Sequence, residues 1–583
     1  MTTTERLAAL WRYAWQMHAR TKALLSMDVT GARDLQVATG GREDNPDSSR
    51  NASAASPQSS ETHTGETGSP DPGDRGSSSS FDVDDNYTLR RKIGLVLGPV
   101  TFALVLLAPT PAELSTAGQT VGAVGAWMAI WWVTEAIPIP VTALLPLFLF
   151  PLTGAISPAE ASAPYANRLV FLFLGGFLLA VAIERWELHR RIALLTIALV
   201  GTSPRRIVLG FMVATAFLSM WVSNTATAML MTPIGLAVVH QTADLVEQSD
   251  LEVPTAEGEF RFGTTLMLSI AYAASIGGVG TLIGSPPNII FAGFVASTYG
   301  QDISFAQWMA YGVPISVIGV VVCWLYLTQV VLRHDLDELP GDTDVISERR
   351  RALGPMTRPE KLVCVVFGAV AVGWLTRRTL LEPLVPMIDD AAIAILGAVA
   401  LFVIPVRDED GEFTFLLDWT TGLKIPWGVI LLFGGGLSLA AGVEESGLGE
   451  WIGAQLFVLE GTALLWIVVA VALLAVFLTE VTSNTAMTAM LVPILGALAV
   501  GLAVHPYALM VTATTVASLA FMLPVATPPN AVVFGSGYLT VPQMAIVGFL
   551  LNLLGVIIVV TFVLGWLPFA WGIDITAPPP WVG

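Results

Sequence analysis

Two short polar stretches stand within apolar sequence and carry the residue types best suited to bind a ligand. They are "WVSNTATAML" (221–230) and "EVTSNTAMTAM" (480–490), which share a Ser-Asn-Thr triplet. Hydroxyl and amide oxygens are hard, uncharged ligands that suit Na⁺, whereas transition metals prefer His or Cys. Ser and Asn also cap the free N–H groups where a helix begins. One triplet alone is therefore open to two interpretations, a cation site or a helix cap.

A second motif, Pro-Pro-Asn, follows each triplet, in "GSPPN" (284–288) and "ATPPN" (526–530). Proline lacks an N–H group and cannot continue a helix interior, so a helix containing either motif must be broken. At membrane depth, broken helices are tolerated where they line a cavity. Their freed carbonyls coordinate cations, and their N-termini favour anions. A lone Pro pair predicts a kink, but two such pairs beside two triplets predict a binding site.

The two halves of the chain repeat one another. Ser223 and Ser483 lie 260 residues apart, and the same offset aligns "GGFLLAVAIE" (175–184) with "GGLSLAAGVE" (435–444). The Pro-Pro-Asn motifs lie 242 residues apart, and the acidic loop after the first triplet absorbs the difference. Two independent motif pairs in the same order indicate an internal duplication.

Fixed positive charge is scarce around these motifs. The apolar segments that contain them hold almost no Lys or Arg, so a bound anion would need helix dipoles and co-bound cations as partners. No soluble effector domain is visible in the sequence, which disfavours a sensor. The histidines all fall in the N-terminal tail or near span ends, which disfavours an intramembrane Ser-His hydrolase or a metal enzyme. They are His18, His63, His189, His240, His334 and His505.

Four acidic residues lie in or at the ends of apolar segments, where ionisable groups are functional candidates by default. They are Glu135, Glu184, Glu444 and Glu480. Glu480 adjoins the second triplet, whereas the equivalent residue of the first repeat is Met220. Two roles are consistent with the position of Glu480, an ion relay and a hydrogen-bonded strut that holds the hairpin, and we prefer the strut.

Composition predicts a polytopic membrane protein. Of 583 residues, 54% are hydrophobic and 13% charged, and the mean hydropathy is +0.69. A soluble domain of this composition could not cover its core with polar surface. Cys323 and Cys364 lie in apolar runs, so no disulfide framework is expected. The net charge of −18 argues against nucleic-acid binding.

About eleven membrane-spanning helices are expected, with two segments that fit no simple span. Residues 205–240 and 463–500 each hold two apolar arms joined at a triplet, and the arms 207–222 and 226–239 are short for a crossing. We expect two re-entrant hairpins, with paired ordinary spans as the alternative. The predicted spans are 93–110, 117–136, 139–154, 167–186, 263–298, 308–333, 358–378, 388–406, 425–445, 506–537 and 543–571.

Basic residues predict a cytoplasmic N-terminus and an extracellular C-terminus, with Arg168, Arg377 and Arg378 as exceptions. Five spans per repeat then give inverted-topology repeats. The predicted parts are a cytoplasmic region 1–92, a first half 93–333, a cytoplasmic linker 334–357, a second repeat 358–573 and a tail 574–583. Within the first part we expect an amphipathic helix over 5–25, on the bilayer or on the protein body, and disorder over 41–80.

In these motifs the sequence resembles the divalent anion/sodium symporters, the sodium-coupled carriers of dicarboxylates, citrate and sulfate. Both triplets, both Pro-Pro-Asn motifs, "WWVTEAIPIPVTALLP" (131–146) and "AIERWELHRRIAL" (182–194) carry the resemblance. It covers roughly residues 93–573, and the region 1–92 has no counterpart. The resemblance implies an all-α fold with scaffold and transport domains, a homodimer in the lipid bilayer, and elevator-type alternating access.

The resemblance also implies site residues. One Na⁺ site would use Ser219, Ser223, Asn224 and the carbonyl of Gly284. The equivalent site would use Thr479, the carbonyl of Thr482, Asn484 and the carbonyl of Ala526. The substrate would contact Asn224, Thr225, Ser285, Asn484, Thr485 and Thr527.

The expected function is therefore sodium-coupled symport of a di- or tricarboxylate such as succinate, malate, fumarate or citrate across the plasma membrane. The alternatives are a sodium-coupled sulfate or oxyanion carrier, a related anion exchanger or arsenite carrier, and a Na⁺/H⁺ antiporter. Proton exchange would require an essential carboxylate, and loss of transport in Glu480→Gln would favour it.

Overall fold

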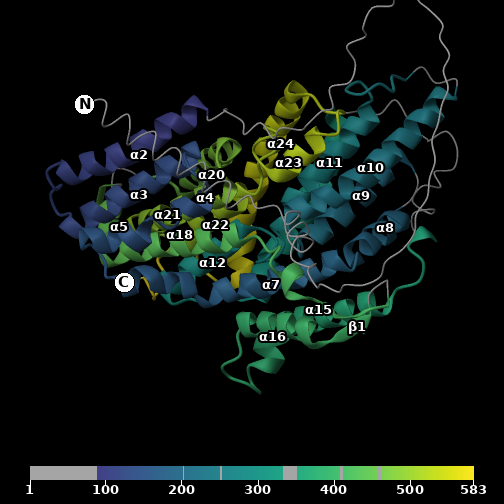
Figure 1. The fold of residues 1–583 in the computed structure, drawn as a ribbon. Helices are drawn as coiled ribbons and strands as arrows, with labels where there is room; N and C mark the ends of the chain where they lie inside the picture. The colour runs from purple at the N-terminus through teal and green to yellow at the C-terminus, as the bar shows by residue number, and fades with distance from the viewer. Residues whose placement is uncertain are drawn as a thin grey trace, which may run out of the picture. The chain divides into compact units, whose positions relative to one another are not determined.

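The computed structural model describes residues 88–200, 203–249, 253–331, 351–407, 411–455 and 461–582. They belong to one compact unit, Val83–Gly583. The predicted helix over 5–25, the stretch 41–80 and linker residues 334–350 lie outside the described residues. The described residues form helices around an extended apolar core, as predicted for an α-helical membrane protein (Figure 1).

Most helices of the first half follow the predicted spans, with breaks where proline interrupts them, and the helices Pro158–Ser162, Ala163–Ala166 and Leu188–Val200 were not predicted. Predicted span 139–154 is divided in two, because Pro146 lacks an N–H group and starts a new helix. The elements are α2 (Leu89–Leu107), α3 (Thr116–Thr134), α4 (Ile139–Thr142), α5 (Leu145–Thr153), α6 (Pro158–Ser162), η2 (Ala163–Ala166), α7 (Arg168–Arg185), α8 (Leu188–Val200), α9 (Pro204–Ser219), α10 (Asn224–Glu247), α11 (Arg261–Gly278), α12 (Pro286–Tyr299), α13 (Phe305–Leu325) and η3 (Tyr326–Val331).

The second half repeats this order and adds a small antiparallel hairpin that the sequence did not predict, with Pro405 opposite Phe415. The elements are α15 (Arg358–Thr376), η4 (Arg377–Leu381), α16 (Asp390–Val403), β1 (Pro405–Arg407), β2 (Phe413–Phe415), α17 (Trp419–Gly422), α18 (Trp427–Glu445), α19 (Leu448–Gln455), α20 (Leu464–Val481), α21 (Asn484–Gly501), α22 (Pro506–Ala517), α23 (Pro528–Phe534), α24 (Val541–Thr561), η6 (Phe562–Trp566) and α25 (Leu567–Trp571).

Eight helices of the described residues are long and apolar enough to cross a membrane. Five of them coincide with predicted spans, and the other three, α10, α20 and α21, lie in the two predicted hairpins. The predicted arm 226–239 was too short, because α10 continues to Glu247 and has 24 residues. Length therefore does not decide between hairpins and paired spans, and the count of eleven spans stays a prediction.

The duplicated order of elements is matched by reciprocal packing. The helix pair α9–α10, then α11 and α12, corresponds to α20–α21, then α22 and α23. Helix α23 packs against α10 and α11 of the other repeat, and α12 packs against α21 and α22. The two halves of the chain therefore interlock through the half-helices that begin with Pro-Pro-Asn.

The three arginines that depart from the predicted charge pattern belong to one ion cluster. Arg168 Nη2 and Arg377 Nη2 each lie 2.8 Å from Asp302, and Arg378 donates to the Asp302 carbonyl at 3.1 Å. Arg377 also pairs with Asp390 at 3.1 Å. The cluster joins the ends of α7, η4 and α16 to the α12–α13 turn, which gives these charges a structural role.

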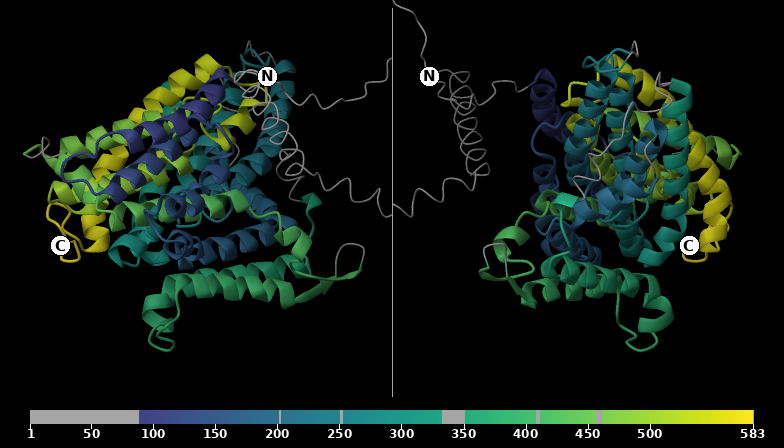
Figure 2. Two further views of the ribbon diagram at one scale, coloured as in Figure 1. Left: turned by 60° about the vertical axis from the view of Figure 1, so that its left-hand side comes forward. Right: turned by 90° about the vertical axis from the view of Figure 1, so that its right-hand side faces the viewer.

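Helices α15 and α16 lie together at one edge of the body and pack against α7 (Figure 2). Near the other end of α7, Arg185 Nη1 lies 2.5 Å from Asp418 Oδ2. Asp418 also caps α17 by accepting from Thr421 N at 2.8 Å. Burial tends to raise the pKa of Asp418, but these hydrogen bonds and the arginine charge together lower it.

Candidate functional site

The first Ser-Asn-Thr triplet forms the turn between α9 and α10, where a serine hydroxyl and an asparagine side chain are hydrogen-bonded. We call such a hydroxyl–asparagine pair a clasp. Ser219, the last residue of α9, has its Oγ 2.6 Å from Asn224 Oδ1 and 2.7 Å from the Ala274 carbonyl oxygen of α11. Its single proton can be donated to either oxygen. Ser223 caps α10 by accepting from Ala226 N at 3.2 Å. The cap and the oxygen cluster therefore coexist at this turn between α9 and α10, which we call the first tip.

The second triplet repeats the same arrangement between α20 and α21. Thr479 Oγ1 lies 2.6 Å from Asn484 Oδ1 and 3.0 Å from the Ala517 carbonyl oxygen of α22. Ser483 caps α21 by accepting from Ala486 N at 3.5 Å. Both Ser219 and Thr479 are fully buried. The triplet residues that form the turns, the first tip at 223–225 and the second tip at 483–485, are half-buried.

Both predicted helix breaks are present beside these tips. Pro286 and Pro287 occupy the first turn of α12, and Pro528 and Pro529 occupy the first turn of α23. Proline is accepted at these positions because a first-turn N–H has no helical partner. The segments 279–285 and 518–527 are therefore non-helical and lie between two half-helices.

The asparagine of each Pro-Pro-Asn motif ties down the non-helical segment before it. Asn288 Nδ2 donates to the carbonyls of Gly278 (3.0 Å) and Thr281 (2.7 Å). Asn530 Nδ2 donates to those of Ala520 (3.1 Å) and Leu523 (3.0 Å). The sequence predicted no role for either asparagine. The repeated motif was a signal for one, but the partners of the side chains were not visible in it.

Around the first tip, backbone and side-chain oxygens gather in a space that a single methyl would fill. A β-carbon at Gly278 would lie 2.6 Å from Asn224 Oδ1 and 3.0 Å from the Gly284 carbonyl oxygen. A β-carbon at Gly284 would lie 3.0 Å from the Ser219 carbonyl oxygen. This set of hard, uncharged oxygens fits Na⁺ and includes three of the four predicted ligands of the first site.

The second site is brought together less completely. Thr479 and Asn484 are in contact, as predicted. Ala526 occupies the place of Gly284 in its repeat, and Thr482 uses its hydroxyl to donate to the Leu478 carbonyl at 2.8 Å. Cation binding by the carbonyls of Thr482 and Ala526 stays a prediction.

One predicted substrate residue of the first repeat contacts a serine of the second repeat that the sequence did not predict. Ser285 Oγ lies 2.9 Å from Ser518 Oγ, and both side chains are buried. Ser518 follows the last residue of α22, so the contact joins the first Pro-Pro-Asn loop to the second broken helix. Thr527 caps α23 by accepting from Asn530 N at 3.4 Å. Thr225 and Thr485 are half-buried in the first turns of α10 and α21.

Glu480 supports the second break with four hydrogen bonds. Its Oε1 accepts from Phe521 N (2.8 Å), Met522 N (2.9 Å) and Asn552 Nδ2 (2.7 Å), and its Oε2 accepts from Leu523 N (3.2 Å). These bonds agree with the predicted strut. In the first repeat, Thr281 supports the break in a similar way, because its hydroxyl donates to the Met220 carbonyl and accepts from Gly284 N.

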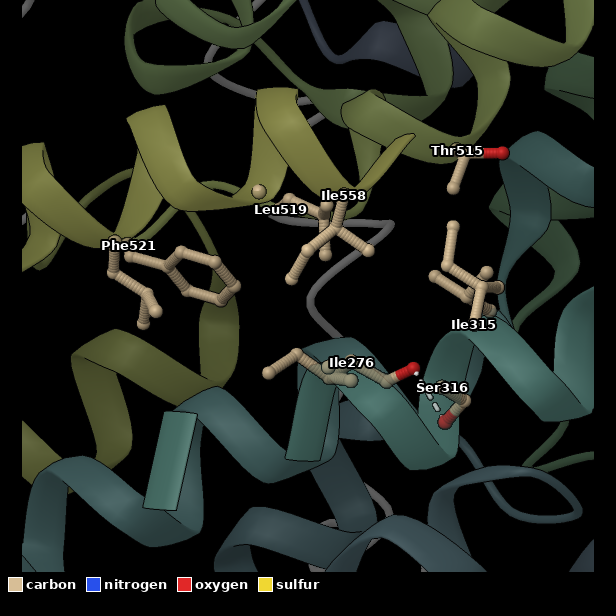
Figure 3. A pocket seen from close by; sticks show the side chains of 11 residues that line it. Ile276, Ile315, Ser316, Thr515, Leu519, Phe521 and Ile558 are labelled. Carbon is tan, nitrogen blue, oxygen red and sulfur yellow. Dashed lines mark hydrogen bonds between the residues drawn. The ribbon is translucent and has the colours of Figure 1, made fainter. Parts of the chain in front are cut away.

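A cavity of about 30 Å³ lies between α11, α13, α22 and α24, and it contains none of the predicted site residues (Figure 3). Its lining is mainly apolar. The two hydroxyls in it are already bonded, Ser316 to the Ile276 carbonyl at 3.0 Å and Thr515 to Tyr311 at 3.1 Å. Because an apolar cavity without free polar groups offers nothing to an ion, this cavity is not the anion or cation site.

Comparison with known proteins settles the family. The sequence profile of the family described as "Sodium:sulfate symporter transmembrane region" matches residues 90–571. The chain belongs to this family. The family assignment confirms the predicted resemblance to the divalent anion/sodium symporters and identifies a multi-pass membrane protein of a transporter family.

Several known transporters share most of their length with the chain. A protein of Staphylococcus saprophyticus named "Sodium-dependent dicarboxylate transporter SdcS" is 46% identical over 497 residues, which cover 85% of this chain and 95% of that protein. A protein of the same name from Staphylococcus aureus is 47% identical, with 85% and 94% covered. The solved structure of the Alcanivorax borkumensis YdaH transporter is 14% identical, with a TM-score of 0.49 over 83% of this chain and 97% of that one.

Proposed function

We propose that the protein is a sodium-coupled symporter of dicarboxylates of the succinate, malate or fumarate class, with citrate as a tricarboxylate candidate. The supporting observation is the pair of equivalent hydroxyl–asparagine clasps, Ser219–Asn224 and Thr479–Asn484, together with the Ser285–Ser518 contact between repeats. Relatives named sodium-dependent dicarboxylate transporters support the choice of ion and anion.

The chemistry of the clasps explains why coupling is needed. Their side chains are neutral, so they offer a dicarboxylate hydrogen bonds but no fixed positive charge. Bringing two carboxylates into such a site without a cation would be costly. Sodium ions held by oxygens of the two tips supply that charge, so the anion binds well only after the cations.

The resemblance to the divalent anion/sodium symporters supports assignments of individual residues, of the assembly and of the moving part. We assign the first Na⁺ site to Ser219, Ser223, Asn224 and Gly284, and the second to Thr479, Thr482, Asn484 and Ala526. The anion contacts Asn224, Thr225, Ser285, Asn484, Thr485 and Thr527. The proposed assembly is a homodimer in the plasma membrane, with the N-terminus inside and the C-terminus outside. A transport domain containing both tips moves against a scaffold.

Uptake by purified protein in liposomes tests this function. We expect labelled succinate to enter when an inward Na⁺ gradient is applied, and not when K⁺ or choline replaces Na⁺. Asn224→Ala and Asn484→Ala should each abolish uptake, while the folded protein still elutes as one species. Uptake driven equally well by K⁺ would contradict the sodium assignment.

Sulfate is the second candidate substrate, because the matching family description names it. The same liposomes distinguish the two anions. Unlabelled succinate in excess should block uptake of labelled succinate, and sulfate at the same concentration should leave it unchanged. Sulfate uptake with no succinate competition would make the protein an oxyanion carrier with the same coupling ion.

A further inference from the structure

An arginine outside both repeats contacts the second hairpin next to its tip. Arg90, in the first turn of α2, donates through Nη2 to the Val481 carbonyl oxygen at 2.8 Å. The same nitrogen donates to the Val133 carbonyl of α3. Val481 is the last residue of α20 and stands two residues before Ser483 of the second triplet. In the sequence, Arg90 served only to predict orientation.

The chemistry of this contact is favourable at a helix end. The last four carbonyls of a helix have no helical partner, and the C-terminus carries a partial negative charge. A guanidinium supplies both a donor and a positive charge, and such charge-assisted bonds are stronger than neutral ones. The bond acts on the peptide group directly before Thr482, whose carbonyl is a proposed Na⁺ ligand.

Arg90 is attached to the α2–α3 pair. Trp131 Nε1 donates to the Gly94 carbonyl at 3.0 Å, and Arg91 pairs with Glu135 at 3.1 Å, so the two helices are held together at the same end. The bond to Val481 therefore links the second tip to this pair of helices.

The first tip is held differently. There the Met220 carbonyl accepts from Thr281, which belongs to the broken helix of the same repeat. The two half-sites therefore contain equivalent hydroxyl–asparagine pairs, but different side chains bind the backbone carbonyl that lies just before each triplet. The first is fixed from within its repeat, and the second is fixed partly from α2.

We propose that Arg90 is a positioning residue for the second tip. Through its bond to Val481, the geometry of Thr482 and Asn484 depends on whether the second hairpin lies beside α2 and α3. While the guanidinium holds Val481, the chain entering Thr482 and Asn484 is fixed in this arrangement. When the hairpin moves away from α2, the bond breaks and that constraint is lost. The proposal rests on the proposed function only in treating the second tip as a cation half-site.

Distances between spin labels test the conformational part without any transport assay. Leu104 on α2 and Leu474 on α20 are both exposed and suit replacement by labelled cysteines in the full-length chain. Cys364 is exposed and would be changed to Ser, whereas Cys323 is buried. In lipid nanodiscs without sodium, the wild-type distance distribution should contain a population that matches this structure.

Arg90→Ala should reduce this population relative to all others by about three- to tenfold, as expected for one exposed charge-assisted hydrogen bond. Arg90→Lys, which keeps the charge, should retain part of it. Arg91→Ala is the matched control, because Arg91 pairs only within α2 and α3 among the contacts that the structure describes. Its distribution should equal that of the wild type. Equal distributions for Arg90→Ala and wild type, or equal shifts for both alanine variants, would overturn the proposal.

A sodium titration gives the second readout. The NaCl concentration that half-saturates thermal stabilisation should rise in Arg90→Ala, stay unchanged in Arg91→Ala, and be partly restored in Arg90→Lys. A distance shift without a change in sodium midpoint would overturn the positioning role, even if the protein carries the proposed dicarboxylate.

Discussion

Replacing Glu480 by Gln separates the two roles considered for this carboxylate, strut and proton relay. The side chain is 3% exposed and accepts four hydrogen bonds, three of them from the backbone after α22. Gln keeps one acceptor oxygen but places an NH₂ group where Oε2 accepts from Leu523. One charge-assisted bond is then lost, which costs about 1.5–3 kcal/mol, and the others weaken as the charge is removed.

We expect Glu480→Gln to lower the thermal unfolding midpoint of the purified protein. Because the supported backbone leads to Ala526, the variant should also need more sodium for half-maximal succinate uptake, while uptake itself persists. Glu445→Gln is the control, since Glu445 is exposed at the end of α18. An unchanged midpoint together with complete loss of uptake would refute the strut and favour a relay.

Three further changes have defined outcomes. Gly278→Ala should remove stabilisation by NaCl in a thermal-shift titration, because the added methyl would lie 2.6 Å from Asn224 Oδ1. Ser518→Ala should weaken succinate binding by about three- to tenfold in calorimetry, because Ser285 loses its hydroxyl partner. Asp418→Asn should lower the unfolding midpoint at pH 7 but not in strong acid. Its lowered pKa makes its contribution complete above the ordinary value of 3.8 and lost as pH falls through the lower folded value.

Matched variants control for general damage in these experiments. Ala520→Gly serves for Gly278→Ala, because the second repeat already carries a methyl at that place, and it should leave sodium binding intact. Ser297→Ala serves for Ser518→Ala, since Ser297 bonds only locally within α12 among the described contacts. Glu445→Gln, at an exposed carboxylate, serves for Asp418→Asn. If a control variant changes the measured quantity as much as the variant it is paired with, the role assigned to that residue is contradicted. Equal unfolding midpoints for wild type and Asp418→Asn at pH 7 would contradict the stabilising role of Asp418.

The sequence predicted those features that depend on local rules or on repetition. Burying polar side chains in apolar surroundings costs free energy unless they form hydrogen bonds or bind a ligand. The repeated polar triplet was therefore enough to locate the two tips. The breaks at Pro286 and Pro528 follow from the missing N–H of proline. The clasp partners Ser219 and Thr479 came from the family resemblance, and the structure places both against their asparagines.

The features that were missed depend on contacts between distant residues. Ser518 lies 233 residues from Ser285, and Arg90 lies 391 residues from Val481, so no spacing rule could pair them. The length of α10 was underestimated because its last turns, beyond residue 239, are polar and resemble the acidic loop that follows. The hairpin of β1 and β2 is too short for alternation of side chains to reveal it.

Two neutral tips that form one site only when sodium is present are central to the proposed function. Succinate stabilisation of the purified protein, measured by thermal shift in NaCl and in choline chloride, tests this directly. We predict a succinate-dependent rise in NaCl, none in choline, and none in either salt for Asn224→Ala or Asn484→Ala. Equal stabilisation in choline, or full stabilisation when one of the two asparagines is missing, would show that the tips do not share a cation-dependent site.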